Sequence, residues 1–305
     1  MSRIEEAIRK MKAQSAAAAV RDDGAAVAPV REPRPLSPDA RAAAEPVPFK
    51  RPTHTPPHAI EIDMASLREA HMLPAPADER KIENEFRSIK RALLGNVTGR
   101  SGRRLQSANI IMVASALPEE GKTFTTLNLA FSLALEKDFR LVLIDGDVAK
   151  PNISRALGLE QRRGLLDVLA DETLRLEDVE VGTNVPGLSV VPAGRQQATA
   201  AELLSSARME QLVAGLGTYT DCLYLFDTTP LLLTNESRVL AEMAGQVVLV
   251  VRAGVTPQGA VMDALAQIPE ERYVGLVLNQ RRGGGGSYYY GYDYGDYGRD
   301  GQETA

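Results

Sequence analysis

The chain has 305 residues, of which 44% are hydrophobic and 25% are charged, as in ordinary globular proteins. Its net charge of -5 provides no basic field for nucleic acid, so we expect no nucleic-acid partner. The single cysteine, Cys222, excludes an intramolecular disulfide, and no apolar run is long enough to span a bilayer. The first residues lack the apolar core of a signal peptide, so the sequence predicts a cytoplasmic protein.

The first quarter of the chain is predicted to lack a folded domain. Residues 1–20 have the three-four apolar spacing of a short amphipathic helix. Residues 21–78 are rich in Ala, Pro and Arg and predict a disordered linker, in which a short apolar patch at 60–67 is a candidate for docking. Helical periodicity returns at 79–94, where one apolar stripe contains Ile82, Phe86, Ile89 and Leu93.

From Ala108 onward, apolar runs typical of buried strands alternate with helical stretches. Runs that are apolar on both faces indicate parallel strands covered by helices on both sides. We therefore predict a doubly wound, mostly parallel α/β sheet at the centre of a domain spanning 79–282, with its ligand beyond the carboxyl ends of the strands. The expected strands are 109–114, 141–144, 188–191, 222–226, 247–251 and 273–278, and the expected helices after the first are 125–136, 200–216, 236–244 and 257–267.

The strongest motif is ALPEEGKT, which has the A-x-x-x-x-G-K-T pattern of a phosphate loop between a strand and a helix. Main-chain N–H groups of such a loop surround phosphates. Lys122 is expected to reach the β- and γ-phosphates, and Thr123 to bind Mg²⁺. The expected nucleotide-binding residues are Ala116, Leu117, Pro118, Glu119, Glu120, Gly121, Lys122, Thr123, Phe124 and Asn279.

Glu119 departs from the pattern because glycine is often found at its position. If the position requires φ above zero, a side chain there is strained. Its carboxylate, beside that of Glu120, also adds negative charge near a triphosphate. Either the loop tolerates these features or nucleotide affinity is reduced.

Three aspartates follow two of the expected strands. Asp145 and Asp147 come after LVLI, and Asp227 ends CLYLF. Phosphoryl transfer requires oxygen ligands for Mg²⁺ and a carboxylate that orients the attacking hydroxyl. Aspartates also cap helices and turns, but three at strand ends beside a phosphate loop favour a catalytic site.

The C-terminal segment 283–305 is a Gly/Tyr/Asp-rich tail. Its stretch GGGGSYYYGYDYGDYG has no aliphatic residues, so the tail is predicted to be flexible, with its phenols exposed. A cluster of nucleophiles tethered to a nucleotide site suggests a substrate carried by its own enzyme. A low-complexity tail without chemistry is the alternative. The tyrosines are Tyr288, Tyr289, Tyr290, Tyr292, Tyr294 and Tyr297.

Together, ALPEEGKT, LVLIDGDVAKP, LYLFDTTP and the tail resemble the Walker A, A′ and B motifs and tyrosine cluster of the bacterial tyrosine kinases. With the MSRIEEAIRK start, the sequence is most similar to the exosortase-associated tyrosine autokinases of exopolysaccharide gene clusters. The resemblance covers residues 79–297 and the first dozen residues. The same motifs occur in the wider deviant-Walker ATPases, and the tail is what distinguishes the kinases.

The resemblance implies an ATP- and Mg²⁺-dependent autokinase that phosphorylates its tail in trans. Lys122, Asp145 and Asp147 would be catalytic, with Asp145 orienting the tyrosine. Asn279 matches the position that reads adenine in related ATPases. The helix at 79–94 resembles the oligomerisation helix of these kinases. The implied metal ligands are Thr123, Asp145, Asp147 and Asp227, and the implied oligomerisation residue is Arg87.

The resemblance also implies partners and leaves alternatives open. A ring-like homo-oligomer, a membrane-embedded polysaccharide chain-length regulator and a tyrosine phosphatase are expected, with the protein peripheral at the inner membrane. A partition-type ATPase switch is one alternative, but it usually carries a lysine where this chain has Leu117. A nucleotide-binding pseudokinase is another. The chain departs from the kinase pattern at Asn84, Lys90, Glu119, Lys150 and Thr229.

Overall fold

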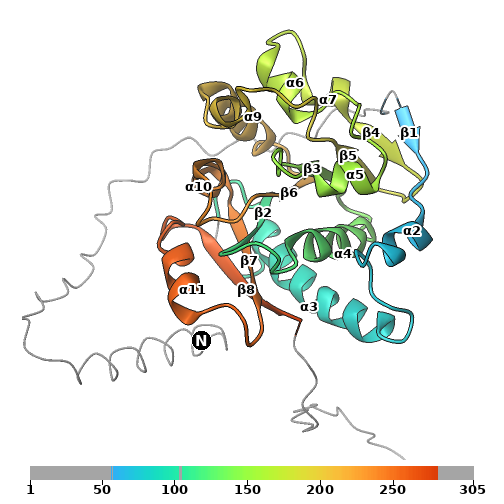
Figure 1. Ribbon diagram of the computed structural model, residues 1–305, viewed down its shortest axis with the longest axis vertical. Helices are drawn as coiled ribbons and strands as arrows, with labels where there is room; N and C mark the ends of the chain where they lie inside the picture. The colour runs from blue at the N-terminus through green and yellow to red at the C-terminus, as the bar shows by residue number, and fades with distance from the viewer. Residues whose placement is uncertain (1–55, 57, 103–104, 281–305) are drawn as a thin grey trace, which may run out of the picture.

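A computed structural model describes residues 56, 58–102 and 105–280. One sheet with the strand order β1-β4-β5-β3-β6-β2-β7-β8 forms its centre (Figure 1). All neighbouring strands pair in parallel except β4 and β5. The strands are β1 (His58–Ile60), β2 (Ile110–Ser115), β3 (Arg140–Asp145), β4 (Val181–Thr183), β5 (Leu188–Val191), β6 (Cys222–Asp227), β7 (Gln246–Arg252) and β8 (Tyr273–Asn279).

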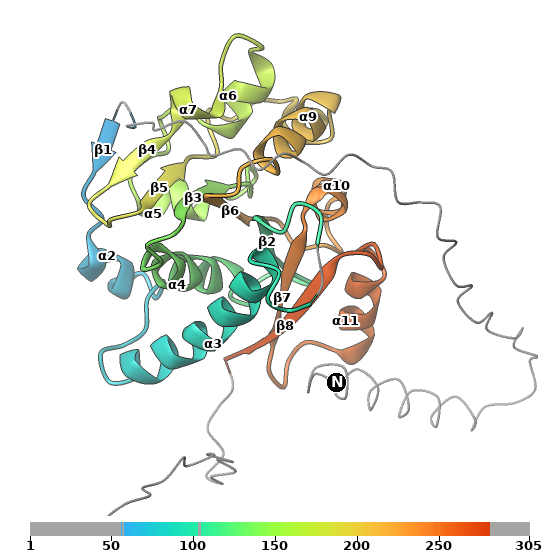
Figure 2. The ribbon, with the colours of Figure 1, turned by 180° about the vertical axis from the view of Figure 1, so that it is seen from behind.

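Helices cover both faces of the sheet, as Figures 1 and 2 show from opposite sides. The first face carries α2 (Met64–Glu69), α3 (Glu79–Val97), α4 (Lys122–Ala134) and α5 (Asn152–Ala156). The second carries α6 (Leu165–Ala170), α7 (Leu176–Val179), α8 (Ala200–Leu204), α9 (Ala207–Leu216), α10 (Asn235–Met243) and α11 (Gln258–Leu265).

The central strands are apolar on both faces, which produces this layered arrangement. In β2, Ile110 and Met112 face the second helical layer, whereas Ile111 and Val113 face the first. This alternation follows from the two-residue repeat of a strand. The predicted fold class is therefore confirmed, and each of the six expected strands is present within about two residues of its predicted ends.

The prediction of a disordered linker through residue 78 is wrong for its last part. β1 extends the sheet beside β4, and α2 follows it. Ile62 and Leu67 are buried, and the Ile62 N–H donates to Asn184 Oδ1 at 3.0 Å. The short apolar patch at 60–67, a docking candidate in the sequence, packs against the core. Its burial offsets the entropy cost of ordering a segment whose overall Ala/Pro composition predicts a linker. The folded unit therefore begins before Glu79, the predicted start of the domain.

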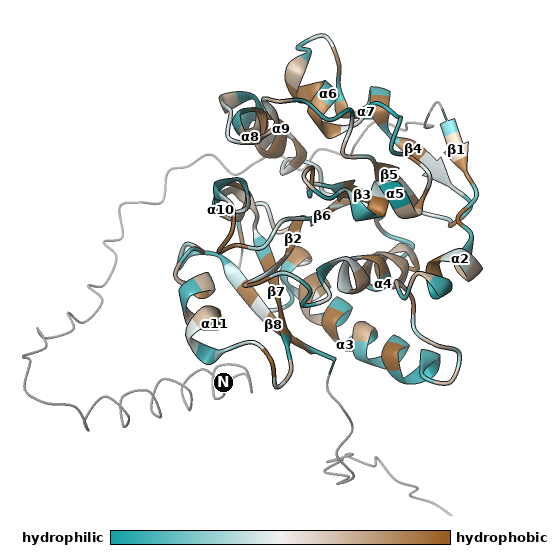
Figure 3. Cartoon of the chain, in the orientation of Figure 1, coloured by the Kyte–Doolittle hydropathy of each residue, from teal (hydrophilic) through white to brown (hydrophobic). Residues whose placement is uncertain are grey.

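The predicted helix at 79–94 is present as α3, which continues to Val97. Phe86 and Leu93 are buried, and the ring centroid of Phe86 lies 6.4 Å from that of Phe124 on α4. Figure 3 shows hydrophobic residues interleaved with hydrophilic ones along α3. The apolar stripe therefore packs within the chain and leaves the polar face outward.

The expected helix at 200–216 is two helices, α8 and α9, with the Ser206 hydroxyl accepting from the Met209 N–H at the start of α9. The amphipathic helix at 1–20, residues 21–55 and the tail at 283–305 lie outside the described residues. Within the described ranges, no helix has the length and apolar character required to cross a bilayer.

Candidate active site

The phosphate loop connects β2 to α4 at the carboxyl edge of the sheet, as its sequence predicts. Lys122 begins α4 and is only 9% exposed. Gly121 has φ of 89°, which glycine adopts without steric cost. A loop followed by a helix N-terminus directs main-chain N–H groups toward an anion. The geometry is therefore suited to a nucleotide phosphate.

Glu119 adopts the left-handed backbone conformation, which is strained for residues that carry a side chain. Its φ is 61°, and the side chain lies on the surface. The strain considered from the sequence is therefore present in the loop. His71 has a similar φ of 56° away from the loop, which provides a natural control.

Glu120 has an internal role that the sequence did not indicate. Its side chain is 2% exposed, and its carboxylate accepts from the Leu117 N–H at 2.8 Å. The Thr256 hydroxyl donates to the other oxygen of the same carboxylate. Thr256 also accepts from the Arg252 N–H at 3.0 Å, so Glu120 joins the phosphate loop to the turn between β7 and α11.

Asn279 contacts the loop from the end of β8. Its Nδ2 donates to the Glu120 carbonyl at 2.9 Å, and its Oδ1 accepts from the Gln280 N–H at 2.8 Å. A Cβ added to Gly121 would lie 2.0 Å from this Nδ2. Asn279 therefore supports the phosphate loop directly, whatever further contact it makes with a base.

Asp227 lies at the end of β6 and binds two hydroxyls of α4. Thr123 Oγ1 donates to Asp227 Oδ2, and Thr126 Oγ1 donates to Oδ1, each at 2.9 Å. Asp227 is fully buried, and burial raises its pKa to about 6, although Lys122 and these hydroxyls oppose the rise. Thr123 and Asp227, two of the expected metal ligands, are thus hydrogen-bonded to each other.

Asp145 is fully buried and pairs in register with Asp227 at the ends of β3 and β6. Ser154 donates to Asp145 Oδ2 through its main-chain N–H at 2.8 Å and its hydroxyl at 2.7 Å. Oδ1 has no hydrogen-bond partner within the described residues. Burial and the nearby charge of Asp227 raise the pKa of Asp145 to about 7. Asp145 therefore has one anchored oxygen and one available oxygen.

Asp147 follows Asp145 on the same loop and is 6% exposed. Its Oδ1 accepts from the Lys150 N–H at 3.0 Å. Burial raises the pKa of Asp147, whereas this hydrogen bond and the charges of Lys122 and Lys150 oppose the rise. Lys122 thus acts electrostatically on both Asp147 and Asp227.

The residues fit a nucleotide-bound Mg²⁺ better than a metal held by protein alone. No group of three or more His, Cys, Asp or Glu side chains that could hold a metal ion occurs in the described part of the chain. Mg²⁺ usually takes one or two protein carboxylates, with phosphate and water completing its ligands. The Thr123 hydroxyl beside Asp227 and the carboxylate of Asp147 supply such oxygens, which leaves the unpartnered Asp145 Oδ1 for the acceptor.

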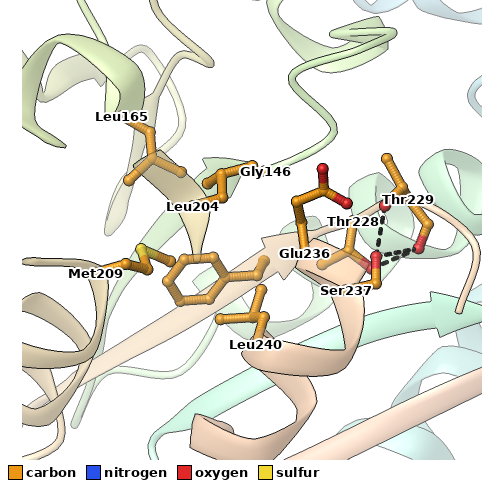
Figure 4. Close-up of a pocket in the computed structure, with 10 residues that line it drawn as sticks. Gly146, Leu165, Leu204, Met209, Thr228, Thr229, Glu236, Ser237 and Leu240 are labelled. Atoms are coloured by element: carbon orange, nitrogen blue, oxygen red, sulfur yellow. Dashed lines mark hydrogen bonds between the residues drawn. The ribbon is translucent and has the colours of Figure 1, made fainter. Parts of the chain in front are cut away.

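A small cavity of about 10 Å³, roughly the space of one water probe, lies on the face of the sheet that carries α8, α9 and α10 (Figure 4). Thr229 borders it, and its hydroxyl lies 2.5 Å from the hydroxyls of Thr234 and Ser237. Thr229 therefore has partners within the chain at a position where related kinases carry proline or serine. The lining residues are Gly146, Leu165, Leu204, Met209, Phe226, Thr228, Thr229, Glu236, Ser237 and Leu240.

The remaining predicted residues lie elsewhere. Arg87 is exposed on α3, where its Nη1 donates to Asn84 Oδ1 at 3.0 Å. Lys90 pairs with Glu136 at 2.6 Å, so this departure from the kinase pattern has a partner within the chain. The six tail tyrosines lie outside the described residues.

Sequence reasoning missed three hydroxyl residues that organise the site: Thr126, Ser154 and Thr256. Thr126 lies on the same face of the helix as Thr123, which is a weak signal. Ser154 and Thr256 contact residues distant in sequence or on other elements, so no local pattern identified them.

The comparison with protein families gives one direct match. Residues 111–287, more than half of the chain, match the CobQ/CobB/MinD/ParA nucleotide binding domain. Tyrosine-protein kinase YwqD of Bacillus subtilis is 32% identical over 179 residues, which are 56% of this chain and 72% of YwqD. The chain belongs to the bacterial tyrosine kinases of this nucleotide-binding family.

Solved structures support this membership of the tyrosine kinase family. The crystal structure of the VpsO kinase domain is 30% identical, with a TM-score of 0.55. The match covers 68% of this chain and 100% of that domain. The described fold is therefore that of a bacterial tyrosine kinase domain.

Other tyrosine kinase relatives are much longer proteins. ExoP of Rhizobium meliloti, named as a succinoglycan biosynthesis transport protein, is 30% identical over 200 residues, which are 64% of this chain and 24% of ExoP. EpsB of Ralstonia nicotianae is 28% identical over 246 residues, 78% of this chain and 31% of EpsB. The chain thus spans less than a third of each of these proteins.

Proposed function

We propose that this chain is an ATP-dependent protein-tyrosine autokinase that phosphorylates its C-terminal tyrosine cluster in trans. The observation that carries the proposal is the convergence of Lys122, Thr123 and Asp145 at the phosphate loop of a tyrosine kinase domain. A tail with six clustered tyrosines supplies the acceptor within the same chain.

The transfer follows from the chemistry of these groups. A tail phenol attacks the γ-phosphorus, the bond from that phosphorus to the β–γ bridging oxygen breaks, and ADP leaves. Asp145 Oδ1 orients the phenol and accepts its proton, while Ser154 holds Oδ2. Lys122 balances charge on the migrating phosphoryl group. Thr123, Asp147 and Asp227 would hold Mg²⁺, which would neutralise charge that develops on the phosphates.

The two alternatives make different demands on the loop. A partition-type switch needs a cation where this chain has Leu117, which is partly buried against the core. A pseudokinase would be consistent with the left-handed backbone conformation of Glu119. An experiment is therefore needed to distinguish a pseudokinase from an active kinase.

The cellular setting is inferred from the relatives of this chain. ExoP is named for succinoglycan biosynthesis and transport, which supports a role for this chain in exopolysaccharide production. We expect it to act at the inner membrane through a membrane-embedded chain-length regulator, with a phosphatase reversing the modification. A ring-like homo-oligomer would let each tail reach the active site of a neighbouring subunit. Arg87, which is exposed on α3, is the residue that we would substitute first to test this assembly.

Incubation of the full chain with Mg²⁺ and labelled ATP tests the activity. Label should appear on tyrosine, and Lys122→Met or Asp145→Asn should lower the rate by orders of magnitude. Asp171→Asn, at an exposed position, is the matched control and should label normally. ATP binding without phosphotyrosine would indicate the pseudokinase, and hydrolysis without phosphotyrosine would indicate the ATPase switch.

A further inference from the structure

Two glycines, each next to an exposed arginine, touch at the edge of the candidate site. A Cβ on Gly164 would lie 2.5 Å from the Gly194 nitrogen and 2.0 Å from the Pro192 carbonyl oxygen. Arg163 precedes the first glycine and Arg195 follows the second, and both side chains are exposed. The contact therefore brings Arg163 and Arg195, which are 32 residues apart in sequence, onto adjoining segments.

A buried carboxylate holds one of these arginines. Asp167 is 4% exposed, and its Oδ2 accepts from the main-chain N–H groups of Gly164 at 2.9 Å and Arg195 at 3.1 Å. Its Oδ1 accepts from Arg195 Nε at 2.9 Å. The Arg195 side chain is still 62% exposed. Asp167 therefore fixes the orientation of the guanidinium, whose outer part remains accessible to a ligand.

Hydrogen bonds connect the segment that carries this arginine to the candidate catalytic carboxylate. The Ala193 N–H donates to the Ser154 hydroxyl at 3.0 Å, and that hydroxyl donates to Asp145. Arg195 lies two residues beyond Ala193. Figure 4 also places Leu165, which follows Gly164, in the same cavity lining as Gly146, which follows Asp145. Arg195 therefore lies two residues from a main-chain N–H that is hydrogen-bonded to the hydroxyl anchoring Asp145.

The charge of the tail is complementary to this place. Arg162 and Arg163, which directly precede Gly164, are further exposed cations. The tail segment 283–305 has four acidic side chains and one arginine. Asp293 lies between two of its tyrosines, and Asp296 precedes another. A guanidinium and a carboxylate form charge-assisted hydrogen bonds, which are among the stronger ones in proteins.

We propose that Arg195, fixed by Asp167, is a specificity-determining residue that binds the aspartates next to the acceptor tyrosines in the tail of a second copy of this chain. The inference rests on the proposed kinase function and adds the basis on which the acceptor is chosen. Tyrosines without a neighbouring acid would be poorer acceptors.

Trans-phosphorylation between two full-length variants tests this. The acceptor carries Lys122→Met and an intact tail. The donor has an active site, with its six tail tyrosines changed to Phe and with Asp293→Asn and Asp296→Asn, so it neither labels nor competes through its own tail. Adding Arg195→Ala to the donor should raise the KM for the acceptor about tenfold, with kcat and the KM for ATP unchanged. Arg195→Lys should recover part of the loss.

Arg175→Ala is the matched control, because Arg175 is also exposed and lies 4.0 Å from Asp178. This donor variant should leave the acceptor KM unchanged. An acceptor with Asp293→Asn and Asp296→Asn should have a raised KM, and Arg195→Ala should add nothing further against it. The same KM for the Arg195→Ala donor and its parent, or a full effect that persists against the neutral acceptor, would overturn the inference.

The two proposals can fail separately. Label transfer that does not depend on Arg195 leaves the kinase function intact and removes only the recognition role. If no donor transfers label, the proposed function is wrong. The inference is then judged by the binding of a fluorescent peptide of residues 283–305 to the donor chain with or without Arg195→Ala. Equal binding overturns it, and weaker binding by the variant supports it.

Discussion

The side-chain amide of Asn279 donates to the main-chain carbonyl of Glu120 at 2.9 Å, which joins the end of the last strand to the phosphate loop. The sequence resemblance assigns Asn279 to adenine recognition. The two roles predict different behaviour toward ATP and GTP, so they can be separated.

Asn279→Asp should weaken ATP and GTP binding by the same factor, about fivefold, because the substitution removes one donor to the loop. Isothermal titration with both nucleotides measures this. A purely adenine-reading residue would instead lose affinity for ATP alone. An unchanged affinity for both nucleotides would contradict the supporting role.

Glu119→Gly should raise both stability and nucleotide affinity. Glycine relieves the left-handed conformation at φ 61°, which is worth about 1 kcal/mol, and removes a charge near the phosphates. Thermal unfolding and ATP titration provide the measurements. His71→Gly, at a similar φ of 56°, should raise stability only. If ATP affinity does not rise in the Glu119 variant, the loop tolerates the side chain when nucleotide is bound.

Much of the fold could be predicted because long patterns determine it. Strands of four or more apolar residues and the phosphate-loop motif were identified from local sequence. β1 and β4 have only three residues each, too few to show a period. Ser154 and Thr256 act through partners on other segments, such as the Glu120 carboxylate, and that proximity exists only once the sheet is formed.

The packing of the segment that contains β1 and α2 against the core should contribute to the stability of the chain. Leu67→Ala should destabilise the chain by about 2 to 4 kcal/mol, because Leu67 is 1% exposed within the core. Denaturant unfolding measures the change. Leu135→Ala is the same substitution at a site that is 76% exposed, and it should cost little. Equal effects of the two substitutions would mean that this segment does not dock in solution.

The buried aspartates predict an unusual dependence of stability on pH. Burial and the charge of Asp227 raise the pKa of Asp145 from 3.8 to about 7 in the folded chain. Between these values the folded state keeps a proton that the unfolded state has lost. The free energy of unfolding therefore falls as pH rises through this range, and Asp227, with its pKa raised to about 6, acts in the same direction.

Melting temperature measured without nucleotide, in the presence of a chelator, should therefore decrease from pH 5 to pH 8, on the order of several degrees. Asp145→Asn should flatten this slope, because the amide does not titrate, and only the contributions of Asp227 and Asp147, whose pKa values are also raised, should remain. Asp171→Asn, at an exposed site, should keep the slope of the parent chain. A parent chain whose melting temperature rises over this range, or an Asp145→Asn slope as steep as that of the parent, would show that Asp145 is ionised in the folded protein. Asp145 would then reach the phenol already as a base, without first losing a proton to solvent.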